Sequence, residues 1–464
     1  MTYLCIRLPA LVVLALISFL SPVPRSFASD VDAETKVGRQ ESIPITPATE
    51  QRIKLSDLIA ELEAANPEIK AARNRWEAAK AIVPQVQTLP DPKLQFGYQR
   101  MPMVDPLEGP MYGVGQELPF PGKLSLKGEV AQRKADRIEQ EYVATRLRVI
   151  ARLKQQYFDL HYVHKAIEVV ERNKILLIQF EKTAKSRYAV GQAAQQDVFR
   201  AQVELSRVLD RLAVLDQQKE SLHAAINRLL LRPPANPFGT PEEIHVTMLT
   251  VPLTELSRRA EEFSPILQAS AKEVERGEQA VALARKEYYP DFDVTALGLR
   301  NDRINDNGYQ VMLGIRIPLY YTSKQREGVR QALSELSGAR DSLANSLQDV
   351  LFRVKDDFVQ AQRAERLVTI LRDAIIPQAT SALQASQAGY GVGKVDFLTL
   401  LNSLLTLQES ELELHGEMVA HEKALARLEE VTGGQLKPAP SLSSGETARI
   451  AEGGTRSVNK IVHR

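Results

Sequence analysis

Hydrophobic residues recur with two different periods along this chain, and each period predicts a different kind of element. From residue 124 to residue 188 they recur every three or four positions with no proline between them, which is typical of a helix with a coiled-coil-like seam. At about 1.5 Å per residue, ~65 residues would form a helix of ~95 Å. The residues of this seam are Ala131, Ala135, Ile138, Tyr142, Val149, Leu153, Leu160, Val163, Ile167, Val170, Leu177 and Ala184.

Four shorter segments alternate apolar and polar residues, which predicts β-strands with two different faces. The first starts near Lys93 and ends before a loop from Met101 to Pro110, the second covers 112–118, the third 292–300 and the fourth 309–318. One face carries Leu94, Phe96, Tyr98, Phe292, Val294, Ala296, Val311, Leu313, Ile315 and Ile317. The opposite face carries Lys93, Gln95, Gln99, Asp293, Thr295, Gln310, Met312, Gly314 and Arg316.

Proline, glycine and capping residues mark further helices in the first half of the chain. Asn66 is placed to cap a helix that begins at Pro67 and runs to about Gln87. Gly191 permits a reversal after the long helix, and another helix follows over 194–230.

The second half predicts helices over 265–289, 323–390 and 395–430. In each half the two shorter helices together nearly equal the long one. We therefore expect them to lie end to end beside it, as a mostly α-helical assembly with a small β part.

The chain contains two copies of one pattern, offset by about 200 residues. The paired landmarks, in the same order in both halves, are Leu55-Ser56-Asp57-Leu58 with Leu253-Thr254-Glu255-Leu256, Asn66-Pro67 with Ser264-Pro265, Pro90-Asp91 with Pro290-Asp291, Pro119 with Pro318, Phe158 with Phe358, and Tyr188-Ala189-Val190-Gly191 with Tyr390-Gly391-Val392-Gly393. This order predicts a first repeat over 53–231, a linker over 232–252 that contributes to a belt at mid-height, and a second repeat over 253–433.

The beginning of the chain is typical of an export signal, expected over residues 1–28. Arg7 precedes an apolar run from Leu8 to Leu20, and Ser26-Phe27-Ala28 resembles a cleavage site. A transmembrane anchor is the alternative, but ~13 apolar residues are too few to cross ~30 Å of hydrocarbon. Cys5 precedes the apolar run, whereas a lipid-modified cysteine would follow it. We expect residues 29–52 to be a flexible lead and 434–464 a disordered tail.

Composition excludes several classes of function. The chain has 59 basic and 58 acidic residues, which gives no electrostatic case for binding nucleic acid. Its single cysteine lies in the expected signal, so the mature chain would have no disulfide, thiol nucleophile or cysteine metal site. No phosphate-binding glycine loop, nucleophile elbow or ligand cluster is present. We therefore expect no enzyme activity and no cofactor.

The four strands have the length and the two faces that a transmembrane β-barrel requires. A soluble sheet covered by helices is the alternative that alternation by itself would favour. Four strands cannot close a barrel, because natural barrels need about eight, and lipid does not tolerate open strand edges. The barrel interpretation therefore requires several chains to pool their strands.

From about Ile53 to Gly433 the chain resembles the TolC-like outer-membrane efflux proteins. The matching segments are Leu55-Ser56 with Leu58, Asn66-Pro67-Glu68-Ile69, the strand exit Gln116-Glu117-Leu118-Pro119-Phe120-Pro121-Gly122-Lys123, Tyr188 with Val190, Gly191, Asp197 and Gln202, and Tyr390 with Val392 and Gly393. The resemblance implies a homotrimer in the outer membrane, in which each chain gives four strands to a shared barrel and its helices form a periplasmic tunnel with a closable tip. It also implies a periplasmic adaptor, an inner-membrane pump of the resistance-nodulation-division type, outer-membrane lipid as a partner, and no chemistry on the cargo.

The strand exit resembles the branch of this family that serves heavy-metal exporters. Export of heavy-metal cations is therefore one expected function, with multidrug efflux or type I secretion as alternatives. A soluble periplasmic coiled-coil adaptor is a competing class, but it would not need two pairs of amphipathic strands. An enzyme is the weakest alternative.

The resemblance places the candidate gate at the two helix tips. Gly191 and Gly393 are the turns, and Asp197 is a candidate acid at the pore mouth, with a helix N-terminal charge as its alternative role. Relatives often carry acids six and nine residues after the second glycine, where this chain has Thr399 and Asn402. We hypothesise that Asp396 partly replaces them as a cation-selecting group.

Other candidates have ordinary structural alternatives. Tyr188 and Tyr390 are candidates for hydrogen bonds between the tip helices, or they simply pack. Lys93, Gln95, Gln310 and Arg316 are candidates for the barrel lumen, although an arginine at this place is equally typical of a membrane interface. His161 and His164 have ligand-compatible spacing, but a solvated helix face is the favoured interpretation, and the Met101-Pro102-Met103 loop is weak as a copper site.

Overall fold

The computed structural model describes residues 52–101, 107–244, 246, 248–302, 304–434 and 436, all within one unit of the chain. The expected signal over 1–28, the lead as far as residue 51, Pro102 and Met103 of the methionine loop, and the tail from 437 to 464 lie outside the described residues.

The two halves of the chain contain the same elements in the same order. The first half comprises α1 (Leu55–Ala65), α2 (Pro67–Gln87), β1 (Lys93–Met101), β2 (Leu107–Leu118), α3 (Lys123–Ala189) and α4 (Gln195–Leu229). The second comprises α5 (Leu253–Phe263), α6 (Pro265–Lys286), β3 (Asp291–Asn301), β4 (Asp306–Arg316), α7 (Gln325–Ile370), a π-helical turn (Leu371–Ile375), α8 (Ile376–Gly391) and α9 (Phe397–Thr432). The expected internal repeat and the mostly helical fold class are confirmed.

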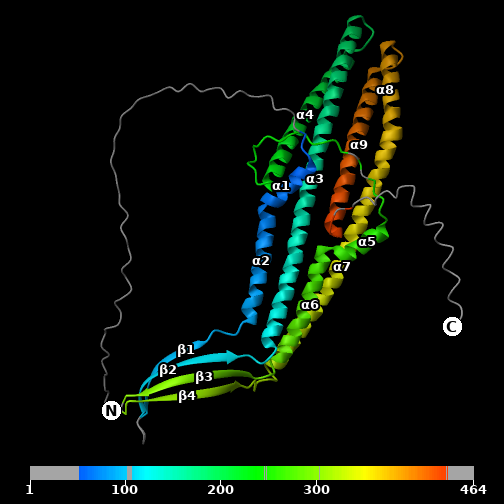
Figure 1. Ribbon diagram of the computed structural model, residues 1–464. Coiled ribbons are helices and arrows are strands. Elements are labelled where there is room, and N and C mark those ends of the chain that lie inside the picture. The colour runs from blue at the N-terminus through cyan, green and yellow to red at the C-terminus, as the bar shows by residue number, and fades with distance from the viewer. Residues whose placement is uncertain are drawn as a thin grey trace, which may run out of the picture. The chain divides into compact units, whose positions relative to one another are not determined.

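Helices from both repeats pack side by side in one layer (Figure 1). The helix α3 packs on α2 and α4 along one side and on α6 and α9 along the other, while α6 and α9 pack in turn on α7, and α9 also packs on α8. Two short helices thus lie beside one long helix in the first repeat, as the helix lengths predicted. Among the helices described, not one combines the length and apolarity that a bilayer crossing requires.

The second long helix runs from Gln325 to Gly391, close to the predicted 323–390, and contains a π-helical turn that was not predicted. Pro377 has no N–H to donate to the carbonyl four residues earlier, and its ring crowds that carbonyl. The π-helical turn from Leu371 to Ile375 widens the helix just before this proline and accommodates it.

Two strand boundaries and two further helices differ from the prediction. The strand β2 begins at Leu107, so the loop expected from Met101 to Pro110 is shorter. The strand β4 ends at Arg316, ahead of Pro318, which has no N–H for the ladder. The helices α1 and α5 were not predicted, although their leucines were recognised as repeat landmarks; α1 buries Leu58 and Leu62.

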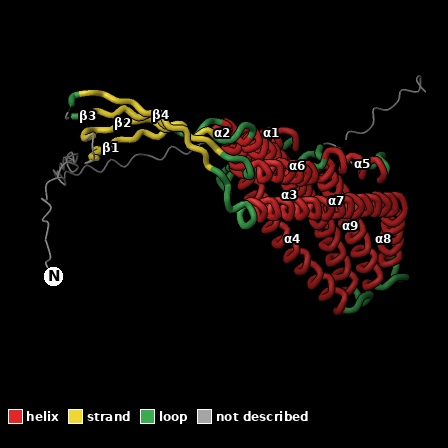
Figure 2. Tube along the Cα trace, turned by 90° about the horizontal axis from the view of Figure 1, so that it is seen from below, coloured by secondary structure: helices red, strands yellow, loops and turns green. Residues whose placement is uncertain are grey.

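The four strands form one antiparallel sheet in the order β1-β2-β3-β4, beyond the ends of α2 and α6 (Figure 2). Its register joins the alternating residues of all four strands into two continuous faces. Leu94 pairs with Val114, Val114 with Ala296, and Ala296 with Val311, all on the apolar face. This face is bare within the chain: Phe96 is 80% exposed and Tyr309 is 89% exposed.

A buried lysine joins the sheet to the helices. Lys123, the first residue of α3, is 2% exposed, and its Nζ donates to Asp291 Oδ1 at 2.9 Å and to the Tyr289 carbonyl at 3.1 Å. Asp291, the first residue of β3, also accepts from the Phe120 N–H at 2.8 Å. The strand exit of the first repeat is therefore anchored to the strand entry of the second.

Histidines gather at mid-height, where the linker between the repeats returns to the helices. His161 and His164 lie on α3 and His223 on α4, and the rings of His164 and His223 are 6.4 Å apart. Within the described ranges, the Nε2 atoms of His164 and His223 are buried without a hydrogen-bond partner. Burial lowers the pKa of all three, and for His164 the neighbouring His223 adds to the effect.

The equivalent junctions of the two repeats allow a matched test of stability. Asn66, buried between α1 and α2, accepts from the N–H groups of Glu68 and Ile69 at 2.9 and 3.2 Å and donates to the Leu229 carbonyl at 2.8 Å. We predict that Asn66→Ala lowers the free energy of unfolding by about 2 kcal/mol, because it removes a cap and leaves a buried carbonyl unpaired. The control is Ser264→Ala, because the Ser264 hydroxyl has no hydrogen-bond partner among the residues that the structure describes. Urea unfolding of the detergent-solubilised protein measures both; equal losses would contradict the prediction.

The histidines at mid-height predict a dependence of stability on pH. An unfolded histidine titrates near pH 6.5, whereas burial holds the folded pKa values lower. As the pH falls through 6.5, the unfolded chain takes up protons that the folded chain does not, so stability falls until the pH lies below the folded pKa values. The melting temperature between pH 7.5 and 5 should therefore fall less in a His164→Gln/His223→Gln variant. The same fall in both proteins would show that other groups are responsible.

Candidate gate at the hairpin tips

Each repeat ends its helical hairpin in the same glycine turn, and both turns lie at the same end of the helices (Figure 1). After α3, the N–H of Gly191 donates to the Tyr188 carbonyl at 3.0 Å and that of Gln192 to the Arg187 carbonyl at 2.8 Å. After α8, Gly393 and Lys394 make the equivalent bonds to Tyr390 and Gly389 at 3.1 and 2.9 Å. The glycines have φ of 71° and 79°, a conformation that favours glycine. Gly191 and Gly393 therefore form the turns, as expected.

The two tip tyrosines have different environments. Tyr390 is 4% exposed, and its ring meets that of Phe397 edge-on at 5.6 Å, whereas Tyr188 is 46% exposed. The Tyr390 hydroxyl is buried without a hydrogen-bond partner in the described part of the chain. Burial raises the pKa of Tyr390, and the nearby carboxylate of Asp197 raises it further. The Tyr390 ring packs within the chain, and a hydrogen bond between the tip helices from the hydroxyl of Tyr188 or Tyr390 stays a prediction.

The candidate acids lie at the starts of two helices. Asp197 is half-buried in the first turn of α4. Asp396 is exposed and caps α9: its Oδ1 accepts from the Thr399 N–H at 3.3 Å and from the Thr399 hydroxyl. These hydrogen bonds lower the pKa of Asp396. Asn402 is exposed on the next turn. Both acids thus occupy positions where a helix dipole favours negative charge.

Arg187 is a tip residue that sequence reasoning missed. It lies near the end of α3, and its Nη1 donates to the backbone carbonyl of Tyr390 at the end of α8. Its guanidinium carbon is 4.8 Å from the centre of the Tyr390 ring. The position of Arg187 four residues before Gly191 was the available signal, because cations near helix C-termini bond to the last carbonyls.

The lumen candidates share the polar face of the sheet. The register aligns Gln95 with Gly113, Leu297 and Gln310 in one row across the strands. Lys93 and Arg316 lie on the same face, where Glu117 receives both, with N–O distances of 2.7 and 3.1 Å. The structure brings these four candidates onto one face; whether the face lines a lumen depends on other chains.

The expected solvated face is wrong for His161, which is 4% exposed. His164 is half-buried, and its ring lies beside that of His223 on α4. The spacing of the two histidines on α3 could not predict their burial, because the residues that cover them come from α4 and the linker. Within the described residues, no group of three or more His, Cys, Asp or Glu side chains is arranged to hold a metal ion.

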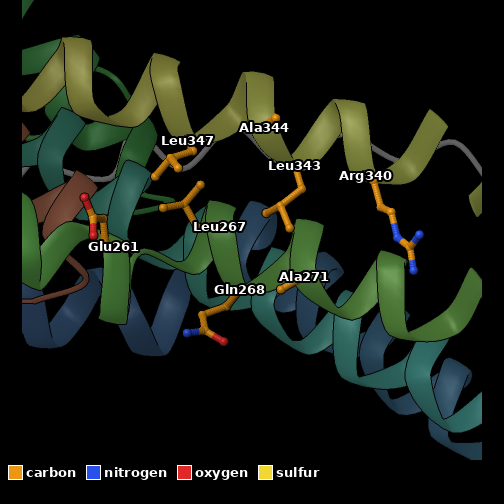
Figure 3. Close-up of a pocket in the computed structure, with 8 residues that line it drawn as sticks. All are labelled: Glu261, Leu267, Gln268, Ala271, Arg340, Leu343, Ala344 and Leu347. Atoms are coloured by element: carbon orange, nitrogen blue, oxygen red, sulfur yellow. The ribbon is translucent and has the colours of Figure 1, made fainter. Parts of the chain in front are cut away.

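A groove of about 440 Å³ lies between α6 and α7, with Glu261 of α5 at one end (Figure 3). Leu267, Leu343 and Leu347 point into the space between the two helices, and Gln268 points away. The remaining lining residues are Ala271, Arg340 and Ala344. Because no nucleophile or ligand cluster faces it, the groove has the character of an incompletely covered helix contact.

The profile of the outer membrane efflux proteins matches residues 58–230 and 256–434, which together are most of the chain. This chain belongs to the outer membrane efflux protein family. It is therefore an outer-membrane efflux channel protein whose helices lie in the periplasm.

Individual relatives agree with this assignment. The cobalt-zinc-cadmium resistance protein CzcC of Cupriavidus metallidurans is 22% identical over 79% of this chain and 87% of its own length. The outer membrane protein TolC of Vibrio cholerae is 20% identical over 66% of this chain and 72% of its own. The crystal structure of VceC, also from Vibrio cholerae, superposes with a TM-score of 0.71 at 18% identity, covering 82% of this chain and 97% of VceC.

The effect of the Asp396 charge can be separated from its role as the N-cap of α9. Asparagine caps a helix about as well as aspartate, so Asp396→Asn removes the charge and retains the hydrogen bond to Thr399. If Asp396 selects cations, we expect this variant to lose cation preference in planar bilayers with its thermal stability unchanged. Asp396→Ala, which removes the cap as well, separates the two effects. Unchanged conductance and cation preference in Asp396→Asn would end the hypothesis.

Proposed function

We propose that this chain works as a homotrimer, the exit duct of a tripartite efflux system, and performs no chemistry on its cargo. The proposal rests on the sheet, whose apolar face is bare and whose outer strands β1 and β4 each have one edge without a partner strand in the described chain. Lipid tolerates an apolar face but no open edge. Three copies would supply about twelve strands, more than the ~8 of the smallest natural barrels.

The helices support the same assembly. The helices at the two sides of the layer carry exposed apolar residues, which a neighbouring copy would cover. On α4 these are Phe199 and Val203, and on α7 they are Phe352 and Val359. A closed ring with the same interface between every pair of copies is the usual way to bury such complementary sides. In that ring the polar face with Lys93, Gln95, Gln310 and Arg316 would line the lumen, and Tyr188, Asp197, Asp396, Thr399 and Asn402 would surround the tip.

Each end of such a duct would meet different partners. Cargo would enter at the tips from a periplasmic adaptor and an inner-membrane pump of the resistance-nodulation-division type, and leave through a barrel in contact with outer-membrane lipid. We propose heavy-metal cations as cargo, because CzcC is by name a cobalt, zinc and cadmium resistance protein. The repeats would extend over 53–231 and 253–433, with 232–252 in a belt at mid-height.

A deletion strain tests the cargo. We expect its growth to fail on cobalt, zinc or cadmium and to be normal on dyes, detergents and antibiotics, with recovery on complementation. Sensitivity confined to lipophilic drugs would overturn the metal proposal and make the chain a multidrug duct, and no sensitivity to either would favour secretion.

Two neighbouring residues give matched controls for the complementation. Phe96→Arg places a charge on the apolar face of β1, at a cost of about 2–4 kcal/mol if that face meets lipid, and should prevent rescue. Gln95→Arg places the same charge on the polar face and should restore growth. Equal rescue by both would contradict the barrel.

A further inference from the structure

The tips hold one hydrogen bond that connects the two hairpins of a single chain. Along its length α8 packs on α9, its partner in the second hairpin. Among the described residues, the side-chain hydrogen bond that reaches α8 from the first repeat is the one from Arg187 to the Tyr390 carbonyl, 203 positions away in sequence. A contact between such distant segments reports tertiary coupling between the hairpins.

Arg187 occupies the carbonyl ends of two helices at once. It lies in the last turn of α3, and its Nη2 is 3.5 Å from the carbonyl of Gln192 in the turn that follows. Its Nη1 donates to the carbonyl of Tyr390, in the last turn of α8. Both helix ends carry partial negative charge, and one guanidinium neutralises both.

The second tip is shaped to receive this side chain. The Tyr390 carbonyl that accepts from Arg187 also accepts the Gly393 N–H of the glycine turn. The guanidinium lies over the Tyr390 ring, and a Cβ added to Gly393 would come within 3.1 Å of Arg187 Nη2. No acidic side chain forms an ion pair with Arg187 among the described residues, so its charge is directed at backbone carbonyls and the ring.

We propose that Arg187 is a positioning residue that holds the end of α8 against the first hairpin, so that the second glycine turn keeps its place only while this contact is made. A planar guanidinium can bond to a carbonyl and stack on a ring together, whereas an ammonium offers a point charge. The consequence for gating rests on the proposed channel function: displacing α8 at the tip requires Arg187 to release Tyr390.

Hydrogen exchange measured by mass spectrometry tests this without reference to transport. In Arg187→Ala, the amides of Gly393 and Lys394 should exchange about tenfold faster, because a charge-assisted hydrogen bond to the adjoining carbonyl is lost. Arg187→Lys should give an intermediate increase. The control is Lys182→Ala, which removes an exposed cation from the same helix one turn earlier and should leave these amides unchanged.

The proposal would be overturned if amide exchange in Arg187→Ala became faster only in residues 186–196, or if Lys182→Ala accelerated exchange at Gly393 and Lys394 equally. If Arg187→Ala does not assemble, the comparison of Arg187→Lys with the unaltered protein decides it. Single-channel recording in planar bilayers is the second readout, in which Arg187→Ala should open more often at equal ion selectivity. If the unaltered protein does not conduct ions, the proposed function is refuted. The hydrogen-exchange result then still tests the role of Arg187 independently.

Discussion

The structure depends on a sheet that one chain cannot complete. In the described part of the chain, its four strands present an uncovered apolar face, and the two outer strands each have an edge without a partner strand. Exposure of the apolar face to water is unfavourable. The unpaired N–H and C=O groups at the two edges can pair with other strands, and in lipid they must do so. The sheet is therefore stable only in an apolar medium and beside the strands of other copies. The helices must be arranged so that they bring those copies together. The exposed apolar residues on the outer helices of the layer offer surfaces that neighbouring copies would cover.

Among the helices, α3 is central to the packing. One side of α3 contacts helices of its own repeat, and the opposite side contacts helices of the second repeat. Its seam of small and branched residues is buried over most of its length. The two tips are then placed by the helices that carry them, and their glycine turns fix how each chain reverses. Arg187 adds a direct contact between hairpins at the point farthest along the helices from the anchoring Lys123.

The sequence predicted what depends on local pattern. Helix caps such as Asn66, the glycine turns and the faces of the strands follow from residue type and spacing, and the repeat revealed the order of elements. What it did not predict depends on partners distant in the chain. The burial of His161 and the contact of Arg187 with Tyr390 arise from neighbours in other helices, and no spacing within α3 encodes them. The π-helical turn before α8 is different, since Pro377 in the sequence indicates a local irregularity in that helix.

The two repeats are interlocked: β2 pairs with β3, α3 packs on α6 and α9, and Lys123 of one repeat holds Asp291 of the other. A chain with a single repeat would have to use one surface at every junction of a closed ring. In a chain with two repeats, the junction inside the chain can differ from the junctions between copies. The side chain of Asn66 makes buried hydrogen bonds, whereas the hydroxyl of Ser264 has no partner in the described part of the chain, and this difference illustrates that freedom. A substitution in one repeat can then be compensated by one in the other repeat of the same gene, and both changes would be inherited together.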